Sequence, residues 1–205
     1  ALAQAADADA RLARGEAVGP LHGVPVAVKD LCWTAGIPTT AGMTIHADFR
    51  PPVDGTVVRR LRGAGTVLLG KLKMTEGAFS AHHPAIPAPL NPWHPDAWTG
   101  VSSSGSGVAV AAGLCPGAIG TDTGGSIRIP AAANGVTGLK PTWGRVSRFG
   151  AFELAASLDH LGPMCRSAAD CGLMLGAIAG ADAVDPTALP APVPDYLAGD
   201  IERLD

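Results

Sequence analysis

The amino-acid sequence predicts an α/β protein, and three observations lead to that class. Helix-like stretches rich in alanine or arginine alternate with short valine- and leucine-rich runs, which is typical of layered α/β folds. Apolar residues make up 47% of the 205 residues and charged residues only 16%, enough to build one good core. The 27 glycines and 18 prolines place much of the chain in tight turns between these elements.

The first half of the chain predicts helices and strands in alternation. They are a helix over 1–16, a strand over 23–30, a helix over 55–61 and a short buried strand over 66–70. Residues 33–53 are loop-like, with three prolines and two glycines. Asp54 is interpreted as the N-cap of the second helix, since its carboxylate could accept from the free N–H groups of the first turn.

Residues 80–99 predict a long loop, because they contain five prolines and little periodicity. A long loop inside a compact domain is often a wall of a binding site. The loop holds His82, His83 and His94, but metal ligands would need regular helical or hairpin spacing. Because the prolines prevent regular helical or hairpin spacing, we interpret these histidines as solvated or packing residues.

The second half predicts further helices and strands around glycine-rich turns. They are a helix that starts near 108, a strand over 116–119, a helix over 127–133, a strand over 135–141, a turn-rich segment over 143–161 and a helix over 168–179. Ser167 and Asp170 resemble a capping box at the start of the last helix. Residues 185–195 are proline-rich and linker-like. The chain begins without Met and stops at Asp205 after another helix-like start, so we expect a fragment.

The composition argues against several kinds of partner. The net charge is −3 with no basic excess, so we expect no direct contact with nucleic acid or an anionic membrane. Neither a signal peptide nor an apolar run of about 20 residues is visible, which favours a cytoplasmic enzyme. The four cysteines form no Cys-x-x-Cys pair and are interpreted as buried small hydrophobic residues: Cys32, Cys115, Cys165 and Cys171.

The glycine-rich stretch 120–128 joins a strand to a helix and contains Ser126 at the end of its turn. Such a junction gathers free backbone N–H groups that can hold a phosphate or the oxyanion of acyl transfer, so Ser126 is a candidate nucleophile. Lys29 ends the valine-rich strand and has two interpretations. It is either a strand-end lysine that reaches water, or a buried lysine whose lowered pKa makes the neutral amine a base.

Several known chemistries of glycine-rich turns do not fit 120–128. No P-loop lysine follows its Gly-Gly pair, and a Gly-x-Gly-x-x-Gly fingerprint is absent. Neither Ser106 nor Ser126 has the Gly-x-Ser-x-Gly spacing of an α/β-hydrolase. A Ser–His–Asp triad through Asp159 and His160 has no supporting spacing. A serine activated by a lysine remains.

A series of ordered blocks along the chain resembles the amidase signature family. They are 21–30, 70–71, 91–93, the Ser/Gly tract 100–107, 120–130, 138–142, 144–147 and 157–163. The resemblance implies a mixed central sheet flanked by helices on both faces, of which this chain holds a part. Family members are much longer at the C-terminus, so residues 1–205 would be the N-terminal, catalytic part of the domain.

The resemblance implies a Ser–cis-Ser–Lys triad, with Ser126 as the nucleophile, Ser102 as the bridging serine and Lys29 as the base. It assigns the oxyanion hole to the backbone N–H groups of Thr123, Gly124, Gly125 and Ser126, and supporting roles to Ser103, Asp122 and Arg128. The family commonly reads Gly-Gly-Ser-Ser-Gly-Gly-Ser where this chain reads Gly-Val-Ser-Ser-Ser-Gly-Ser. The cis peptide bond is therefore expected between Val101 and Ser102. No metal and no cofactor is implied.

The function implied by the resemblance is an amidase that hydrolyses a carboxylic amide through an acyl-enzyme. Three alternatives stay open: the amidase subunit of a tRNA-dependent amidotransferase, a truncated inactive or anion-binding module, and phosphoryl chemistry at 120–128. The expected partner is a small-molecule amide, and a homodimer is left open as the oligomeric state. Phe79, Trp93 and Trp98 are candidates to line the acyl side, although packing is the favoured role for each.

Overall fold

The structure of the chain is a computed structural model, and it describes residues 1–198. The helices are α1 (Leu2–Ala13), α2 (Thr56–Gly63), α3 (Ser104–Ala111), α4 (Arg128–Asn134) and α5 (Ala168–Ile178). The strands are β1 (Pro25–Lys29), β2 (Val67–Leu72), β3 (Gly117–Asp122), β4 (Thr137–Gly138) and β5 (His160–Cys165). Short 3₁₀ helices, η1 (Thr44–His46) and η2 (Glu76–Ala78), lie in the loops.

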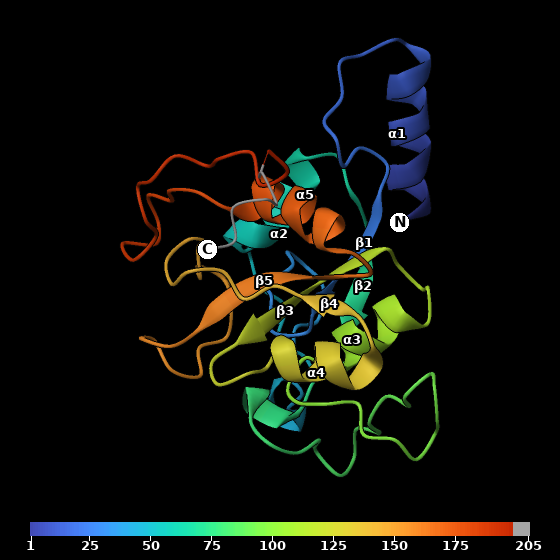
Figure 1. Ribbon diagram of the computed structural model, residues 1–205, viewed down its shortest axis with the longest axis vertical. Helices are drawn as coiled ribbons and strands as arrows, with labels where there is room; N and C mark the ends of the chain where they lie inside the picture. The colour runs from blue at the N-terminus through green and yellow to red at the C-terminus, as the bar shows by residue number, and fades with distance from the viewer. Residues whose placement is uncertain (199–205) are drawn as a thin grey trace.

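The strands form one mixed sheet in the order β2-β1-β3-β5-β4. β1 pairs in parallel with β2 and β3, whereas β5 runs antiparallel to β3 and β4. α2 and α5 pack together on one face of the sheet, and α3 and α4 pack together on the other (Figure 1). The predicted α/β class and the mixed sheet with helices on both faces are confirmed.

Successive side chains of β1 and β3 point to opposite faces of the sheet, so these strands contribute to the core on both faces. Val28 and Ile119 point into the main core cluster, which also contains residues of α2 and α5. Ala27 and Ala118 point the other way, toward α3. Lys29 is the next residue along β1 after Val28, so its side chain lies on the α3 face as well.

The predicted N-cap of α2 is wrong. The helix begins at Thr56, and Gly55 occupies the N-cap position. Asp54 instead accepts a hydrogen bond from the Ala35 N–H at 2.8 Å, and its Oδ2 lies 3.0 Å from Arg62 Nε. Asp54 therefore ties the preceding loop to the last turn of the helix, through contacts that the local sequence does not reveal.

Strand β5 is missing from the sequence-based prediction, which places a turn-rich segment up to residue 161. Gly162 and Pro163 lie in the middle of the strand, and both residue types are depleted in strands. β5 nevertheless pairs with β3 over its whole length. The Pro163 carbonyl also accepts a hydrogen bond from the Leu139 N–H at 3.0 Å. The strand thus forms because of its sheet partners and not because of its own propensity.

Among the other elements, the helix expected to start near 108 begins at Ser104, and the strand expected over 116–119 continues to Asp122. The Ser167 cap is confirmed, since its Oγ accepts a hydrogen bond from the Asp170 N–H at 3.1 Å. The predicted strand over 135–141 is shorter, because only the residues of β4 pair with β5. The helix-like start before Asp205 lies outside the described residues.

The linker-like segment 185–195 follows an irregular path beside Arg145. The Arg145 guanidinium donates hydrogen bonds to the carbonyls of Ala191 and Pro192 at 3.2 and 2.6 Å. The Leu189 N–H donates to the Gly144 carbonyl at 2.8 Å. The role of this segment as a linker stays a prediction.

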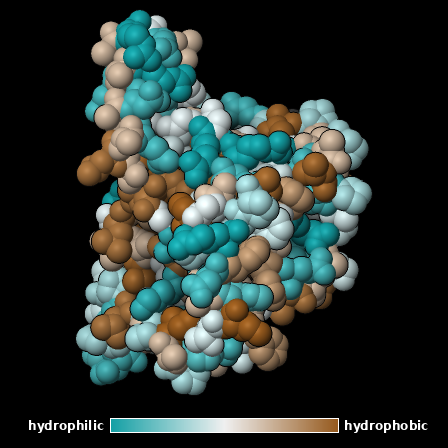
Figure 2. Space-filling view, turned by 180° about the vertical axis from the view of Figure 1, so that it is seen from behind, coloured by the Kyte–Doolittle hydropathy of each residue, from teal (hydrophilic) through white to brown (hydrophobic). Residues whose placement is uncertain are grey.

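Helix α1 projects from the body of the molecule, and its surface is largely hydrophilic (Figures 1 and 2). Ala8 is its buried residue. All four cysteines are free and buried, as predicted. No helix within residues 1–198 is long and apolar enough to cross a membrane.

Candidate active site

Lys29 is the last residue of β1 and is completely buried. Its Nζ donates hydrogen bonds to Ser102 Oγ at 2.6 Å and to Thr121 Oγ1 at 2.7 Å. The alternation of β1 explains this position, because it turns Lys29 toward α3 and away from the main core cluster. Of the two interpretations open from the sequence, the structure selects the buried lysine.

Burial lowers the pKa of Lys29 to about 7, although the nearby acidic groups of Cys32 and Asp122 act in the opposite direction. A lysine with this pKa is roughly half neutral at neutral pH. The neutral amine has a lone pair, so the Ser102 hydroxyl can donate its proton toward Lys29. Lys29 therefore has the protonation behaviour that a general base needs.

Ser102 and Ser103 lie at the start of α3, and both are completely buried. The Val101–Ser102 peptide bond is cis, as predicted. Ser103 Oγ donates to the Thr121 carbonyl at 3.2 Å and accepts from the Thr121 N–H at 3.1 Å. The Ser103 N–H donates to the Ser126 carbonyl at 3.3 Å. The serine tract is thus joined both to β3 and to the turn that carries Ser126.

Asp122 organises the turn that carries Ser126. Its buried carboxylate accepts hydrogen bonds from the N–H groups of Gly125 at 2.8 Å and Ile127 at 3.1 Å. The Arg128 guanidinium donates to both carboxylate oxygens at 3.0 Å. Burial alone would raise the pKa of Asp122, but the Arg128 guanidinium and the backbone N–H groups together hold it below its usual value. The turn is therefore built around an ionised and fully partnered carboxylate.

Replacement of Asp122 with alanine is expected to lower the free energy of unfolding by about 3 kcal/mol or more. The reason is that the buried N–H groups of Gly125 and Ile127 lose their acceptor. Urea unfolding followed by circular dichroism measures the loss. Asp122→Asn keeps an acceptor oxygen and serves as the control with a smaller expected loss. Equal stability of wild type and Asp122→Ala would contradict this account of the turn.

The turn requires a glycine at position 125. Gly125 has a φ of 129°, a conformation that residues with a side chain rarely adopt. A Cβ atom there would also lie 2.7 Å from Cδ1 of Ile129. Backbone geometry therefore explains this glycine without any phosphate ligand.

The backbone N–H groups around Ser126 differ in whether they already have an acceptor. The Gly125 N–H donates to Asp122 Oδ1. Within residues 1–198, no acceptor pairs with the N–H groups of Thr123, Gly124 or Ser126. Among the predicted oxyanion donors, these three N–H groups are the ones free to bind a ligand.

Other candidate catalytic groups are engaged elsewhere. Ser106 Oγ donates to a backbone carbonyl of β3 at 3.0 Å. One oxygen of Asp159 accepts from two backbone N–H groups of the turn before it, at 2.8 and 3.0 Å. The two ring nitrogens of His160 lie 3.1 Å from the Asp122 carbonyl and 3.2 Å from Lys140 Nζ. Asp159 and His160 thus bond to different groups and not to each other, although both contact the start of the turn that carries Ser126.

Thr121 is a residue of the site that sequence reasoning missed. Its hydroxyl accepts a hydrogen bond from Lys29, and its backbone N–H and carbonyl both contact Ser103. In the parallel pairing of β1 and β3, Val28 lies opposite Ile119, so the ends of both strands lie together and the Lys29 side chain reaches Thr121. That register is set by the sheet and could not be read from either strand alone.

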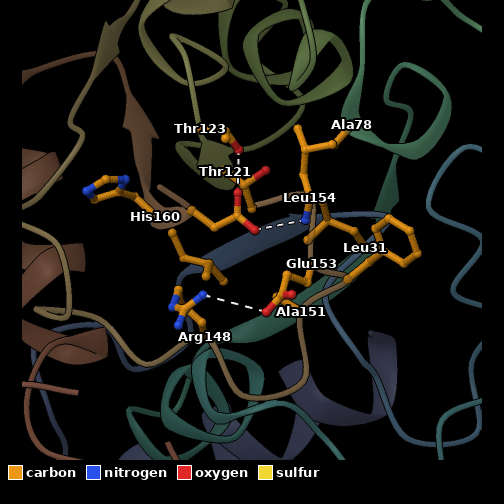
Figure 3. A pocket seen from close by; sticks show the side chains of 12 residues that line it. Leu31, Ala78, Thr121, Thr123, Arg148, Ala151, Glu153, Leu154 and His160 are labelled. Atoms are coloured by element: carbon orange, nitrogen blue, oxygen red, sulfur yellow. Dashed lines mark hydrogen bonds and ion pairs between the residues drawn. The ribbon is translucent and has the colours of Figure 1, made fainter. Parts of the chain in front are cut away.

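A small cavity of about 30 Å³ lies beside the turn that carries Ser126 (Figure 3). Thr121, Thr123 and His160 line one side of it, and residues 151–154 line the other. Asp159 lies between the two sides, where it accepts a hydrogen bond from Thr123 Oγ1 at 2.5 Å. The cavity is of a size to hold water, but it is too small for an organic group.

The loop 80–99 does not line this cavity, and its role as a wall of a binding site stays a prediction. It packs instead on the C-terminal end of α4, where Trp93 Nε1 donates to the Asn134 carbonyl at 2.7 Å. Phe79, Trp93 and Trp98 are 71%, 70% and 62% exposed, so all three lie mainly at the surface.

The histidines of this loop have protein partners. His82 Nε2 lies 3.1 Å from Ser104 Oγ, and His83 Nε2 lies 3.3 Å from Thr44 Oγ1. In the part of the chain that the structure describes, no group of three or more His, Cys, Asp or Glu side chains could hold a metal ion.

Known proteins with similar sequences cover this chain almost completely. A family model described as Amidase matches residues 1–204. Amidase AmiD of Mycobacterium tuberculosis is 63% identical over 198 residues, which are 97% of this chain and 42% of that protein. One subunit of the Glutamyl-tRNA(Gln) amidotransferase of Chloroflexus aggregans is 52% identical over 209 aligned residues, covering 100% of this chain and 43% of that protein. The chain therefore spans less than half the length of these relatives.

Solved structures agree with the sequence matches. Native peptide amidase from Stenotrophomonas maltophilia is 44% identical and superposes with a TM-score of 0.88, over 95% of this chain and 41% of that one. The Glutamyl-tRNA(Gln) amidotransferase of Thermotoga maritima contains a subunit that gives a TM-score of 0.80 at 39% identity, over 86% of this chain and 40% of that one. Because the family model matches almost every residue and the fold is the same, the chain belongs to the amidase family.

Proposed function

We propose that this chain carries the acyl-transfer centre of an amidase that hydrolyses the C–N bond of a small carboxylic amide. Ser126 is the nucleophile, Ser102 relays a proton, and Lys29 is the base. The observation that supports this best is that Lys29 is completely buried, with its Nζ 2.6 Å from Ser102 Oγ. This burial lowers the pKa of Lys29 to about 7. The hydrogen bond from the Ser103 N–H to the Ser126 carbonyl ties the turn that carries Ser126 to the residue after Ser102.

In the first half of the reaction, Ser126 Oγ attacks the carbonyl carbon of the amide. Its proton passes to Ser102, and the Ser102 proton passes to the neutral Lys29, since a hydroxyl can donate and accept at once. The tetrahedral intermediate has a negative oxygen, and the free N–H groups of Thr123, Gly124 and Ser126 are its proposed donors.

In the second half, the C–N bond breaks and the leaving amine takes a proton from Ser102, which is reprotonated by Lys29. This leaves an ester on Ser126. Water then attacks the ester and loses its proton along the same path. The carboxylic acid is thereby released from Ser126. Asp122 and Arg128 contribute by holding the turn in shape, because they form an ion pair and the Asp122 carboxylate also accepts from the Gly125 N–H.

A fluorophosphonate probe is expected to label Ser126. An activated serine displaces fluoride from the probe and forms a stable phosphorus–oxygen bond, so peptide mass spectrometry locates the modified residue. Ser106→Ala is the matched control and should label normally, because Ser106 donates its hydroxyl to a backbone carbonyl. A label on Ser106, or no label in a correctly folded protein, would contradict the assignment and favour the anion-binding module.

A second candidate function is the amidase subunit of a tRNA-dependent amidotransferase. It is favoured by the 52% identity, across the whole chain, to one subunit of a Glutamyl-tRNA(Gln) amidotransferase. In that function the released ammonia would pass to a partner subunit. Glutaminase activity measured with and without the other amidotransferase subunits separates the two candidates, since a free-standing amidase does not depend on them.

Two further expectations concern location and assembly. A cytoplasmic location is supported by the four free, buried cysteines, because reduced thiols are typical of that compartment. Cell fractionation tests it. A homodimer is the second expectation, and light scattering after size-exclusion chromatography tests it by measuring the mass in solution.

A further inference from the structure

A larger hollow of about 350 Å³, lined by aromatic residues, lies next to the small cavity described above. Its walls include the side chains of Trp33, His46, Phe49 and Phe152. The rings of Trp33 and Phe49 meet edge to face with their centroids 5.9 Å apart, and His46 lies 6.1 Å from Phe49 and 6.3 Å from Phe152. We call this hollow the aromatic pocket.

The concentration of rings around this pocket is unusual for the chain. The sequence has only four phenylalanines and four tryptophans, and aromatic residues make up 4% of it. Phe49 and Phe149 pack against Trp33, with ring centroids 5.9 and 6.2 Å from it, and Phe152 packs against His46. Rings of this kind bury large apolar areas and hold other rings by edge-to-face or offset contacts.

The aromatic pocket adjoins the proposed chemistry. Leu31 and residues 151–153 line both the aromatic pocket and the small cavity, so the two share a wall. The small cavity also touches Thr121, which accepts a hydrogen bond from Lys29. A group held in the aromatic pocket would therefore lie next to the small cavity that borders the turn that carries Ser126.

Backbone hydrogen bonds hold the walls of the aromatic pocket in place. The Phe152 N–H donates to the Leu31 carbonyl at 3.1 Å, and the Trp33 N–H donates to the Gly150 carbonyl at 2.7 Å. The Thr39 N–H donates to the Phe49 carbonyl at 2.9 Å. Because three segments of the chain are held together in this way, the aromatic rings are positioned before any ligand binds.

Two polar side chains of the aromatic pocket, Thr39 and Glu153, already have partners. The Thr39 hydroxyl donates to the Ile37 carbonyl at 3.2 Å and accepts from Lys71 Nζ at 2.8 Å. Glu153 is 64% exposed, and its carboxylate lies 3.9 Å from Arg148. Apart from these two groups and the ring nitrogens of His46 and Trp33, the walls are apolar, which favours an apolar ligand.

We propose that the aromatic pocket binds an aromatic or similarly bulky apolar substituent of the amide substrate. The proposal rests on the proposed function and names its substrate class: amides in which a ring lies close to the scissile bond. Phenylacetamide places the ring on the acyl side and acetanilide places it on the amine side, so these two compounds distinguish the orientation.

The test compares the ring-bearing amides with acetamide in the wild-type protein and its variants. Trp33→Ala and Phe152→Ala are each expected to lower kcat/KM for the preferred ring-bearing amide by at least ~10-fold, and to change kcat/KM for acetamide by less than ~3-fold. Phe79→Ala is the matched control, because Phe79 is 71% exposed and lines neither cavity. Phe152→Leu keeps an apolar wall and should give an intermediate loss if Phe152→Ala fails to fold.

A binding measurement separates failure of the pocket from failure of the proposed function. Calorimetric titration of Ser126→Ala with phenylacetamide and acetanilide should show binding of one of them that Phe152→Leu weakens. Such binding in a protein that hydrolyses no amide would support the pocket and overturn the proposed function. Hydrolysis of acetamide that depends on Ser126, with no preference for either ring-bearing amide and no effect of Trp33→Ala, would overturn the pocket alone.

Discussion

Replacement of Ser126 with alanine is expected to reduce amide hydrolysis by at least ~10⁴-fold, because the acyl group then has no hydroxyl to which it can bind. Ammonia release under steady-state conditions measures the loss. The fold should survive, since the change removes a single hydroxyl from a half-buried side chain. The free energy of unfolding is therefore expected to stay within ~1 kcal/mol of the wild-type value.

The matched control for this substitution is Ser106→Ala. Ser106 belongs to the same serine and glycine tract as Ser102, but its hydroxyl donates to the Ile119 carbonyl at 3.0 Å. Its loss should cost about 1 kcal/mol of stability and leave the chemistry intact. If Ser126→Ala kept a tenth or more of the wild-type rate, the acyl-enzyme mechanism would be wrong.

Replacement of Lys29 with methionine is expected to lower kcat/KM by at least ~10³-fold, because Ser102 then has no base to take its proton. The pH dependence supplies an independent readout. Burial lowers the pKa of Lys29 to about 7, so the wild-type kcat/KM should rise as pH increases toward 7 and level off above it. The methionine variant should lose this step in its pH profile.

Stability should respond to Lys29→Met in the opposite direction from activity. The pKa of Lys29 is about 7 in the folded protein, against an ordinary lysine value of 10.5. Between these two values the unfolded chain binds a proton that the folded chain does not, so wild-type stability increases as pH rises from 7 toward 10.5. The variant should lack this increase and be more stable than the wild type near pH 7, as denaturant unfolding at several pH values would show.

Lys71 offers a matched control for Lys29. Burial lowers the pKa of Lys71 as well. Its Nζ, however, donates to the Cys32 carbonyl and to the Thr39 hydroxyl at 2.8 Å, and it forms an ion pair with Asp30 at 3.2 Å. Lys71→Met should cost stability and leave the pH step in kcat/KM in place. Loss of that step in Lys71→Met, or its persistence in Lys29→Met, would assign the titration to a different group.

Local sequence patterns predicted an element correctly where the residues that the folded segment buries are the ones that its apolar periodicity places on one face. The valines of 24–28 predict β1, and the Ser167 cap predicts the start of α5. The glycine-rich turn at 120–128 could also be found from the sequence, because a turn with a φ of 129° at Gly125 needs a glycine whatever surrounds it.

Patterns failed where a distant segment supplies the partner. β5 contains Gly162 and Pro163 and is a poor strand by itself, yet the whole of β3 pairs with it. Asp54 has the residue type of an N-cap, but the Ala35 N–H and Arg62 take its carboxylate. In both cases contacts made only after folding outweigh local preferences of about 1 kcal/mol.

The sequence by itself determined the α/β class, the strand that ends on Lys29 and the turn that carries Ser126. The tertiary structure decided that Lys29 is a buried group and not a lysine at the surface. That decision depends on Ser102, 73 positions later, and on Thr121, 92 positions later, which reach Lys29 only when α3 and β3 pack beside β1. The physical reason is that a pKa responds to the surroundings of a charge, and the surroundings of Lys29 exist only in the folded protein.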